Sequence, residues 1–246
     1  LPFRRYLSLG DSISIDRYPA LDQQRREDAS APISGLGAAS LLYENDDRRW
    51  PEFAGRDLVS AREDIDWTDL SMDGATVTTV LESQLPQLPK HVPGPILVTL
   101  TVGGNDFLRL LGSAHEEDDI AASLRNDVVE DILSGFREIL RRLDDRVPEG
   151  QVVVGTVYDP TDGTGVLHDG RERSSLLEYL HDLNCSLEEI SADFGARIVD
   201  IHDHFLGHGL SEDDPSERWY WNPMIIEPSA QGASEVRRLW VEEIGL

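Results

Sequence analysis

Apolar runs alternate with amphipathic segments along almost the whole chain. Five short strand-like segments predict strands over residues 5–9, 64–70, 95–102, 151–157 and 197–201. The third segment is apolar on both faces, which is typical of a central strand in a covered parallel sheet. Helical spacing of apolar residues predicts helices over 51–59, 73–85, 120–143, 175–194 and 230–244. This alternation predicts an α/β fold, with a parallel sheet between two layers of helices.

One long segment breaks the rhythm. Residues 16–45 are polar and contain Pro19, Pro32, Gly35 and Gly37, so we expect a long excursion over one edge of the sheet. Excursions of this length are more often functional than idle. The chain contains no internal repeat, low-complexity tract or linker, and we therefore expect a single domain over residues 1–246.

Charge excludes several classes of partner. The 47 acidic and 22 basic residues give a formal net charge of −25, which repels nucleic acid and anionic membranes. Lys90 is the only lysine, and this bias fits either a salt-rich cytoplasm or a genome that favours arginine codons. A small-molecule substrate is the expected partner.

The location of the protein is predicted from what the sequence does not contain. No apolar run is long enough to cross a bilayer, and the N-terminus leads directly into the first expected strand, so no signal peptide is expected. Cys185 is the only cysteine, which excludes an internal disulfide and a cysteine-based zinc site. Together these features favour a cytoplasmic location.

Three short polar motifs follow three of the expected strands. They are Gly10-Asp11-Ser12, Asp73-Gly74 and Gly103-Gly104-Asn105-Asp106. Parallel strands end at one edge of a sheet, where ligands bind, so these motifs converge. Ser12 is the candidate nucleophile. The N–H groups of Ser12 and Gly74 and the side-chain amide of Asn105 are candidate donors to an oxyanion.

At these residues the chain resembles the SGNH, or GDSL, hydrolase family. Gly10-Asp11-Ser12-Ile13 resembles its first block, Gly74 its second, and Gly103-Gly104-Asn105-Asp106 its third. The resemblance implies a flavodoxin-like α/β/α fold with five parallel strands in the order 2-1-3-4-5. It also implies an esterase, lipase, acetylhydrolase or thioesterase activity that needs no metal or other cofactor.

The fourth block departs from the family pattern. The family usually carries Asp-x-x-His-Pro-Asn and a following Gly before the last helix, where the His is the general base. Here the matching stretch runs from Met224 to Gly232, with Glu227 in the His position and Met224 in the Asp position. Burial could raise the pKa of Glu227 and make it the base. Alternatives are a histidine from elsewhere (His202, His204 or His208), or a site that binds without hydrolysis.

Other polar clusters have competing interpretations. Asp11 and Asp106 are expected as turn or capping residues. His202 and His204, on one face of a strand, suggest a metal site, although polar residues around a strand end explain them more simply. The segments 158–163 and 219–221 are candidates for the pocket wall, the latter also for core or lid. The acidic runs 116–119 and 212–214 are expected to be solvated.

The function predicted from the sequence is a serine hydrolase of the esterase or lipase type. It would cleave a carboxylic ester, acetyl or thioester group through an acyl-enzyme on Ser12, with Gly74, Asn105 and Glu227 as the other site residues. Two alternatives remain open: a catalytically silent ligand-binding protein on the same fold, and a metal-dependent hydrolase that uses the histidines of 202–208.

Overall fold

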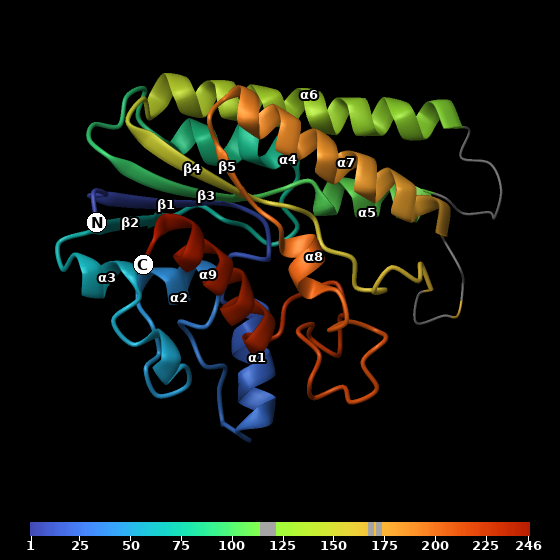
Figure 1. The fold of residues 1–246 in the computed structure, drawn as a ribbon, viewed down its shortest axis with the longest axis horizontal. Coiled ribbons are helices and arrows are strands. Elements are labelled where there is room, and N and C mark those ends of the chain that lie inside the picture. Colours follow the sequence, from blue (N-terminus) through green and yellow to red (C-terminus); the bar gives the residue numbers. More distant parts are fainter. Residues whose placement is uncertain (114–121, 167–169, 171–173) are drawn as a thin grey trace.

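The fold is built on a five-stranded parallel sheet (Figure 1). The computed structural model describes residues 1–113, 122–166, 170 and 174–246. The strands are β1 (Arg5–Gly10), β2 (Asp66–Asp69), β3 (Ile96–Thr101), β4 (Gly150–Gly155) and β5 (Arg197–Val199). Their order in the sheet is β2-β1-β3-β4-β5, and every neighbouring pair is parallel. The predicted fold class and strand order are therefore confirmed.

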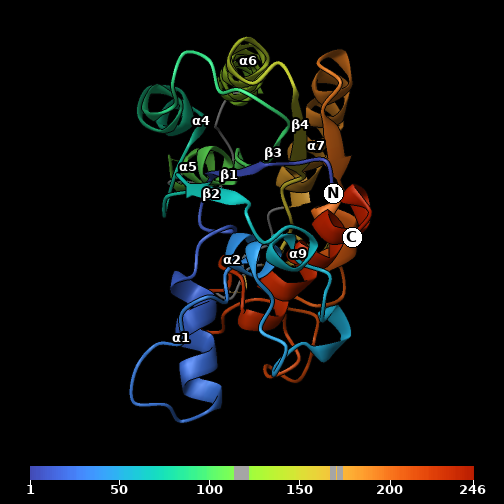
Figure 2. The same ribbon diagram turned by 90° about the vertical axis from the view of Figure 1, so that its left-hand side faces the viewer.

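Helices cover both faces of the sheet (Figure 2). One layer contains α4 (Val77–Thr79), α5 (Gly104–Ser113), α6 (Ala122–Arg146) and α7 (Ser174–Asp193). The other contains α1 (Arg17–Arg26), α2 (Ala38–Tyr43), α3 (Leu58–Ala61) and α9 (Ala230–Ile244). The short helix α8 (Ile201–Phe205) follows β5. In the part of the chain that the structure describes, no helix is long and apolar enough to cross a membrane.

Alternation along the strands divides the core into two clusters. Tyr6 and Leu97 face α2 and α9, whereas Leu7, Leu9 and Val98 face the layer of α4 to α7. All six residues of β3 are buried, which agrees with the two-sided apolar pattern of its sequence. The sheet is thus clamped between helices, and its strand ends are fixed points from which the loops project.

Three local predictions differ from the structure. The excursion over 16–45 contains the helices α1 and α2. The carboxylate of Asp16, at the start of this excursion, holds its later part by accepting from the N–H groups of Gly35 and Gly37 and from the Ser40 hydroxyl. The helix expected over 51–59 is split into a 3-10 turn (Pro51–Phe53) and α3, because Gly55 adopts a φ of +76° between them.

The third difference concerns the last strand. It ends at Val199, and the side chain of Asp200 caps α8 by accepting from the N–H of Asp203 at 3.0 Å. His202 and His204 therefore lie on a helix, and the strand alternation that would have placed them on one face does not apply. The acidic run 116–119 lies outside the described residues.

Helix α4 continues into a π-helical turn (Val80–Gln84) and a 3-10 turn (Leu85–Gln87). Gln84, at the end of the π turn, is completely buried beneath the end of β1. Its side-chain amide pairs twice with the Gly10 backbone, accepting from the N–H and donating to the carbonyl, each at 2.8 Å. Gln84 therefore fixes the backbone at the point where β1 leads into Ser12.

Candidate active site

The turn that carries Ser12 is shaped by close backbone contact between β1 and β3. Gly10 has a φ of +113°, and a Cβ atom there would lie 1.9 Å from the carbonyl oxygen of Thr101. The next N–H group, from Asp11, donates to that same oxygen at 3.0 Å. Only glycine tolerates both the dihedral and the approach. Ser12 is thus presented at the carboxyl edge of the sheet, and its side chain is nearly buried.

Asp11 forms the expected turn and has an unusual environment. Its Oδ1 accepts from the N–H of Ile13 at 3.2 Å. The side chain is buried in the wall of the site, and this burial raises the pKa of Asp11 to about 7, against the opposing effect of a hydrogen bond with Thr101. Negative charge on Asp106 raises the pKa of Asp11 further.

The donors proposed for the oxyanion lie on two linked loops. Asn105, in the first turn of α5, donates one side-chain N–H to the carbonyl of Ala75 at 3.0 Å, and its second N–H has no acceptor among the residues that the structure describes. Gly74 adopts a φ of +70°, which glycine allows. Among the described residues, neither the N–H of Ser12 nor that of Gly74 has a hydrogen-bond acceptor.

Asp106 fixes the same two loops from another point. Its Oδ2 accepts from the N–H of Val77 at 3.0 Å, so Asp106 caps the start of α4 rather than its own helix. The pKa of Asp106 is raised by burial, against the lowering effect of this bond. Asn105 and Asp106 together therefore tie the start of α5 to the segment that follows Gly74.

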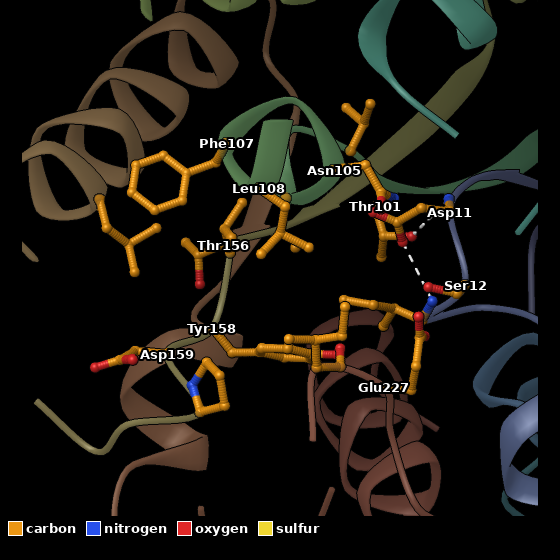
Figure 3. Close-up of a pocket in the computed structure, with 18 of the residues that line it drawn as sticks. Asp11, Ser12, Thr101, Asn105, Phe107, Leu108, Thr156, Tyr158, Asp159 and Glu227 are labelled. Atoms are coloured by element: carbon orange, nitrogen blue, oxygen red, sulfur yellow. Dashed lines mark hydrogen bonds between the residues drawn. The ribbon is translucent and has the colours of Figure 1, made fainter. Parts of the chain in front are cut away.

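Glu227 lies beside Ser12, at the same end of the pocket (Figure 3). The residue is 5% exposed, and its Oε2 has no hydrogen-bond partner within the described part of the chain. Burial raises the pKa of Glu227 to about 7. A hydrogen bond from the Ser12 hydroxyl opposes the rise, whereas negative charge on Asp73 and Asp11 adds to it.

The loop before α9 holds Glu227 through backbone hydrogen bonds. The carbonyl of Glu227 accepts from Trp221 at 2.7 Å, and its own N–H donates to the carbonyl of Met224 at 2.9 Å. The Tyr158 hydroxyl donates to the carbonyl of Ile226 at 2.6 Å. The Ser229 hydroxyl caps α9 by accepting from the N–H of Gly232. The base candidate is therefore held without belonging to a strand or helix.

An apolar cavity of about 120 Å³ opens beside the pair. Ser12, Asn105 and Glu227 line one end of it, together with Asp11 and Thr101, whereas Gly74 does not line it. The remaining wall is mostly apolar and comes from α5, α7 and the loops after β4 and before α9; its side chains include Phe107, Leu108, Val157, Leu177, Leu180 and Ile226. Figure 3 shows Phe107 and Leu108 on the far side from Ser12.

The histidines considered as alternatives lie in other surroundings. His208 stacks on Trp219 with ring centroids 3.6 Å apart, and His204 bonds to the buried Glu235 at 3.0 Å. None of His202, His204 and His208 lines the cavity. Among the described residues, no group of three or more His, Cys, Asp or Glu side chains is placed to hold a metal ion.

Of the two segments predicted to line the pocket, 158–163 and 219–221, only the first does so. The turn after β4 contributes Tyr158, Asp159, Pro160 and Thr161 to the cavity wall. The Asp159 carboxylate holds this turn by accepting from Thr161 and Gly163. In contrast, Trp219, Tyr220 and Trp221 do not line the cavity, and Tyr220 is completely buried in the core.

The structure also brings residues to the site that the sequence pattern does not identify. Tyr18, near the start of α1, places its hydroxyl 3.0 and 3.1 Å from the two carboxylate oxygens of Asp73. Arg17 forms an ion pair with the same carboxylate. Both residues lie in the polar excursion, whose sequence carries no periodic pattern that would place them. The available signal was the length of the excursion.

Comparison with known proteins agrees with this geometry. The model of the GDSL-like lipase/acylhydrolase family matches residues 8–234, a range that includes every candidate site residue. The chain therefore belongs to this family of hydrolases, and the resemblance seen in its motifs is confirmed. A search of curated protein sequences gives no significant match.

Solved structures share the fold over nearly the whole chain. Phospholipase A1 from Streptomyces albidoflavus is 22% identical, with a TM-score of 0.62, 98% of this chain covered and 99% of that one. The extracellular lipase from Streptomyces rimosus is 21% identical, with a TM-score of 0.64 and the same coverage. The acetylxylan esterase Axe2 from Geobacillus stearothermophilus is 16% identical, with a TM-score of 0.59, 99% of this chain covered and 94% of that one.

Proposed function

We propose that this protein hydrolyses carboxylic esters through an acyl-enzyme on Ser12, with Glu227 as the general base. The observation that carries the proposal is the buried carboxylate of Glu227 facing the Ser12 hydroxyl, with its Oε2 unpartnered within the described residues. A base must lie within reach of the proton it accepts and have a pKa near the working pH. Glu227, with its pKa raised to about 7, meets both conditions.

The reaction proceeds in two balanced halves. The Ser12 oxygen attacks the acyl carbon while its proton passes to Glu227, and negative charge develops on the former carbonyl oxygen. The N–H groups of Ser12 and Gly74 and the free N–H of Asn105 donate to that oxygen. The intermediate collapses and expels the alcohol, which takes the proton back from Glu227. Water then attacks the acyl-enzyme, with Glu227 again accepting the proton. The second intermediate collapses, the bond from the acyl carbon to Ser12 breaks, the Ser12 oxygen takes the proton back from Glu227, and the carboxylic acid leaves.

The cavity supports an apolar acyl group. Its wall beyond Ser12 and Asn105 is formed mainly by aliphatic and aromatic side chains. Each methylene buried there contributes about 0.8 kcal/mol of binding. An ester of a short fatty acid is therefore a better probe of this site than an acetate. The names of similar structures, a phospholipase, a lipase and an acetylxylan esterase, agree with ester chemistry and differ in substrate.

The test is turnover of p-nitrophenyl butyrate by wild type, Ser12→Ala and Glu227→Gln. We expect Ser12→Ala to abolish measurable turnover, and Glu227→Gln to reduce kcat about 10²- to 10⁴-fold because the proton has no acceptor. For wild type, kcat/KM is expected to rise with pH around a midpoint near 7, since Glu227 must be ionised to act.

Ser83→Ala and Glu82→Gln are the matched controls, because both side chains are exposed. Wild-type turnover in Ser12→Ala would overturn the proposed nucleophile and favour a silent, ligand-binding protein on this fold. Full activity of Glu227→Gln across the pH range would overturn the proposed base and leave the nucleophile in place.

A further inference from the structure

Tyr18 connects two loops that carry groups of the proposed site. The residue is 5% exposed, and its hydroxyl donates to the Asp73 carboxylate at 3.0 and 3.1 Å. Its ring also contacts the ring of Trp221, with centroids 5.3 Å apart and a tilt of 44°. One buried side chain of α1 thus touches the segment after β2 and the segment before α9.

Each contact leads directly to a group of the proposed site. The peptide between Asp73 and Gly74 carries the N–H that is a candidate oxyanion donor. From the other side, Asn105 holds the next residue, Ala75, through its carbonyl. The N–H of Trp221 donates to the carbonyl of Glu227 at 2.7 Å. Tyr18 therefore links the loop of Gly74 to the loop of Glu227. Its partner Asp73 is the neighbour of Gly74 in the chain, and its partner Trp221 is hydrogen-bonded to Glu227.

Asp73 also contributes charge to the environment of Glu227. Met224 stands in the position of the motif's Asp, and its side chain is 43% exposed. The charged and titratable groups that interact with Glu227 are Asp11, Arg17, Tyr18, Asp73 and Tyr158. Asp73 makes the largest charge contribution to the environment of Glu227 and raises its pKa. Arg17, which is 61% exposed, acts in the opposite direction.

We propose that Tyr18 and Asp73 are positioning residues for the reaction: through the Asp73 carboxylate and the Trp221 ring, Tyr18 holds the Gly74 peptide and the Glu227 loop in a fixed relation to Ser12. The inference rests on the proposed function, because it assigns a role relative to Ser12 and Glu227.

The test compares Tyr18→Phe, Asp73→Asn and the double variant with wild type. Tyr18→Phe keeps the ring against Trp221 and removes only the hydroxyl. We expect kcat for p-nitrophenyl butyrate to fall about tenfold, with KM within about twofold, because a small displacement of a donor affects the reacting state most. Asp73→Asn keeps the hydrogen-bond acceptor and removes the charge. We expect the acid-side midpoint of kcat/KM to move down by about 0.5 to 1 pH unit.

Arg17→Gln is expected to shift the pH midpoint in the direction opposite to Asp73→Asn. Arg17 lowers the pKa of Glu227, so its removal is expected to move the midpoint to higher pH. Tyr43→Phe, which removes a tyrosine hydroxyl at a ring stacked on Trp67, is the control for loss of a hydroxyl and is expected to leave both kcat and the midpoint unchanged. The double variant is expected to lose less than the product of the two single effects, since both act on one contact.

A purely structural role predicts a different result. It would lower the melting temperature of Tyr18→Phe and Asp73→Asn without separating kcat from KM and without moving the midpoint. That result, or unchanged kinetics in both variants, overturns this inference, provided that turnover still depends on Ser12. Turnover that persists in Ser12→Ala overturns the proposed function as well. If Tyr18→Phe does not fold, kcat and KM of Asp73→Asn, in which the acceptor of the Tyr18 hydroxyl is no longer charged, decide the question.

Discussion

The two halves of the candidate site are held in different ways. The half with Ser12, Gly74 and Asn105 lies at the ends of β1, β2 and β3, whose positions are fixed by the backbone ladders of the sheet. The half with Glu227 lies on the loop before α9, which does not pair with the sheet. Single hydrogen bonds with Trp221, Met224 and Tyr158 hold this loop. The comparison teaches that the ladders of the sheet bring the candidate nucleophile and donor loops to one edge, whereas the loop of the candidate base is held by isolated hydrogen bonds outside the sheet.

The largest effect on the half with Ser12, Gly74 and Asn105 is expected from a substitution at Gly10. In Gly10→Ala the new Cβ would meet the Thr101 carbonyl oxygen at 1.9 Å, in addition to the unfavourable φ of +113°. Because the obstacle is backbone at the centre of the sheet, we expect the free energy of unfolding to fall by more than about 4 kcal/mol, or cooperative unfolding to be lost. Urea unfolding followed by tryptophan fluorescence measures this.

Gly55→Ala is the matched control for Gly10→Ala. Gly55 also has a positive φ, +76°, but nothing lies within 4 Å of its would-be Cβ. Only the dihedral is strained there, and a cost of about 1 to 2 kcal/mol is expected. Equal losses in the two variants would mean that the close approach of β1 to β3 contributes nothing to the requirement for glycine.

Substitution of Glu227 is expected to stabilise the fold, because the ionised form of this buried carboxylate destabilises it. The pKa of Glu227 is raised from 4.5 to about 7, so the neutral form is favoured in the folded protein. The associated stability is complete below about pH 4.5 and is lost as the pH rises through 7. At about 1.4 kcal/mol per pKa unit, Glu227→Gln is expected to be more stable than wild type at pH 8.5 by up to about 3 kcal/mol.

This gain should shrink strongly by pH 5, where Glu227 is mostly protonated. Urea unfolding at both pH values, with the exposed Glu82→Gln as the control for loss of one negative charge, measures the difference. A Glu227→Gln variant that is less stable than wild type at pH 8.5 would contradict this account of the buried carboxylate.

The smallest of the three effects is expected at Gln84, where a side chain supports the half with Ser12. Gln84→Leu keeps much of the volume and removes both hydrogen bonds to Gly10. The Gly10 carbonyl retains a bond from the N–H of Met72, whereas the Gly10 N–H is left without its acceptor. One buried unsatisfied donor costs about 1 to 3 kcal/mol. Urea unfolding is the measurement, with the exposed Gln87→Leu as control; equal stability of the two variants would contradict the prediction.

The same division explains how far the sequence predicts this molecule. Strand-like segments predict β1, β2 and β3, and parallel strands share an edge, so Ser12, Gly74 and Asn105 are predicted to converge without knowledge of any side-chain contact. The role of Tyr18 is not predictable in this way. It lies in α1, a polar helix whose position depends on hydrogen bonds such as that between Asp22 and the N–H of Ala230, which are distant in sequence.

The prediction for the segment after β5 was wrong for a related reason. Continuing the strand to Ile201 assumed that its alternation of side chains persists, but Asp200 caps a helix and redirects the chain. A local polar contact therefore decided the positions of His202 and His204. Hydrophobic patterning carries no information about such a contact, because the apolar residues Ile201 and Phe205 are buried as helix residues as well as they would be in a strand.

A carboxylate opposite Ser12 has a consequence for how charge moves during the proposed reaction. A histidine base becomes a cation as it takes the proton, and a pair of opposite charges then forms beside the substrate. Glu227 instead becomes neutral while the substrate oxygen becomes negative, so one negative charge changes place and no pair of opposite charges forms. No cation accompanies the oxyanion from the base, and its stabilisation therefore depends all the more on the N–H groups of Ser12, Gly74 and Asn105.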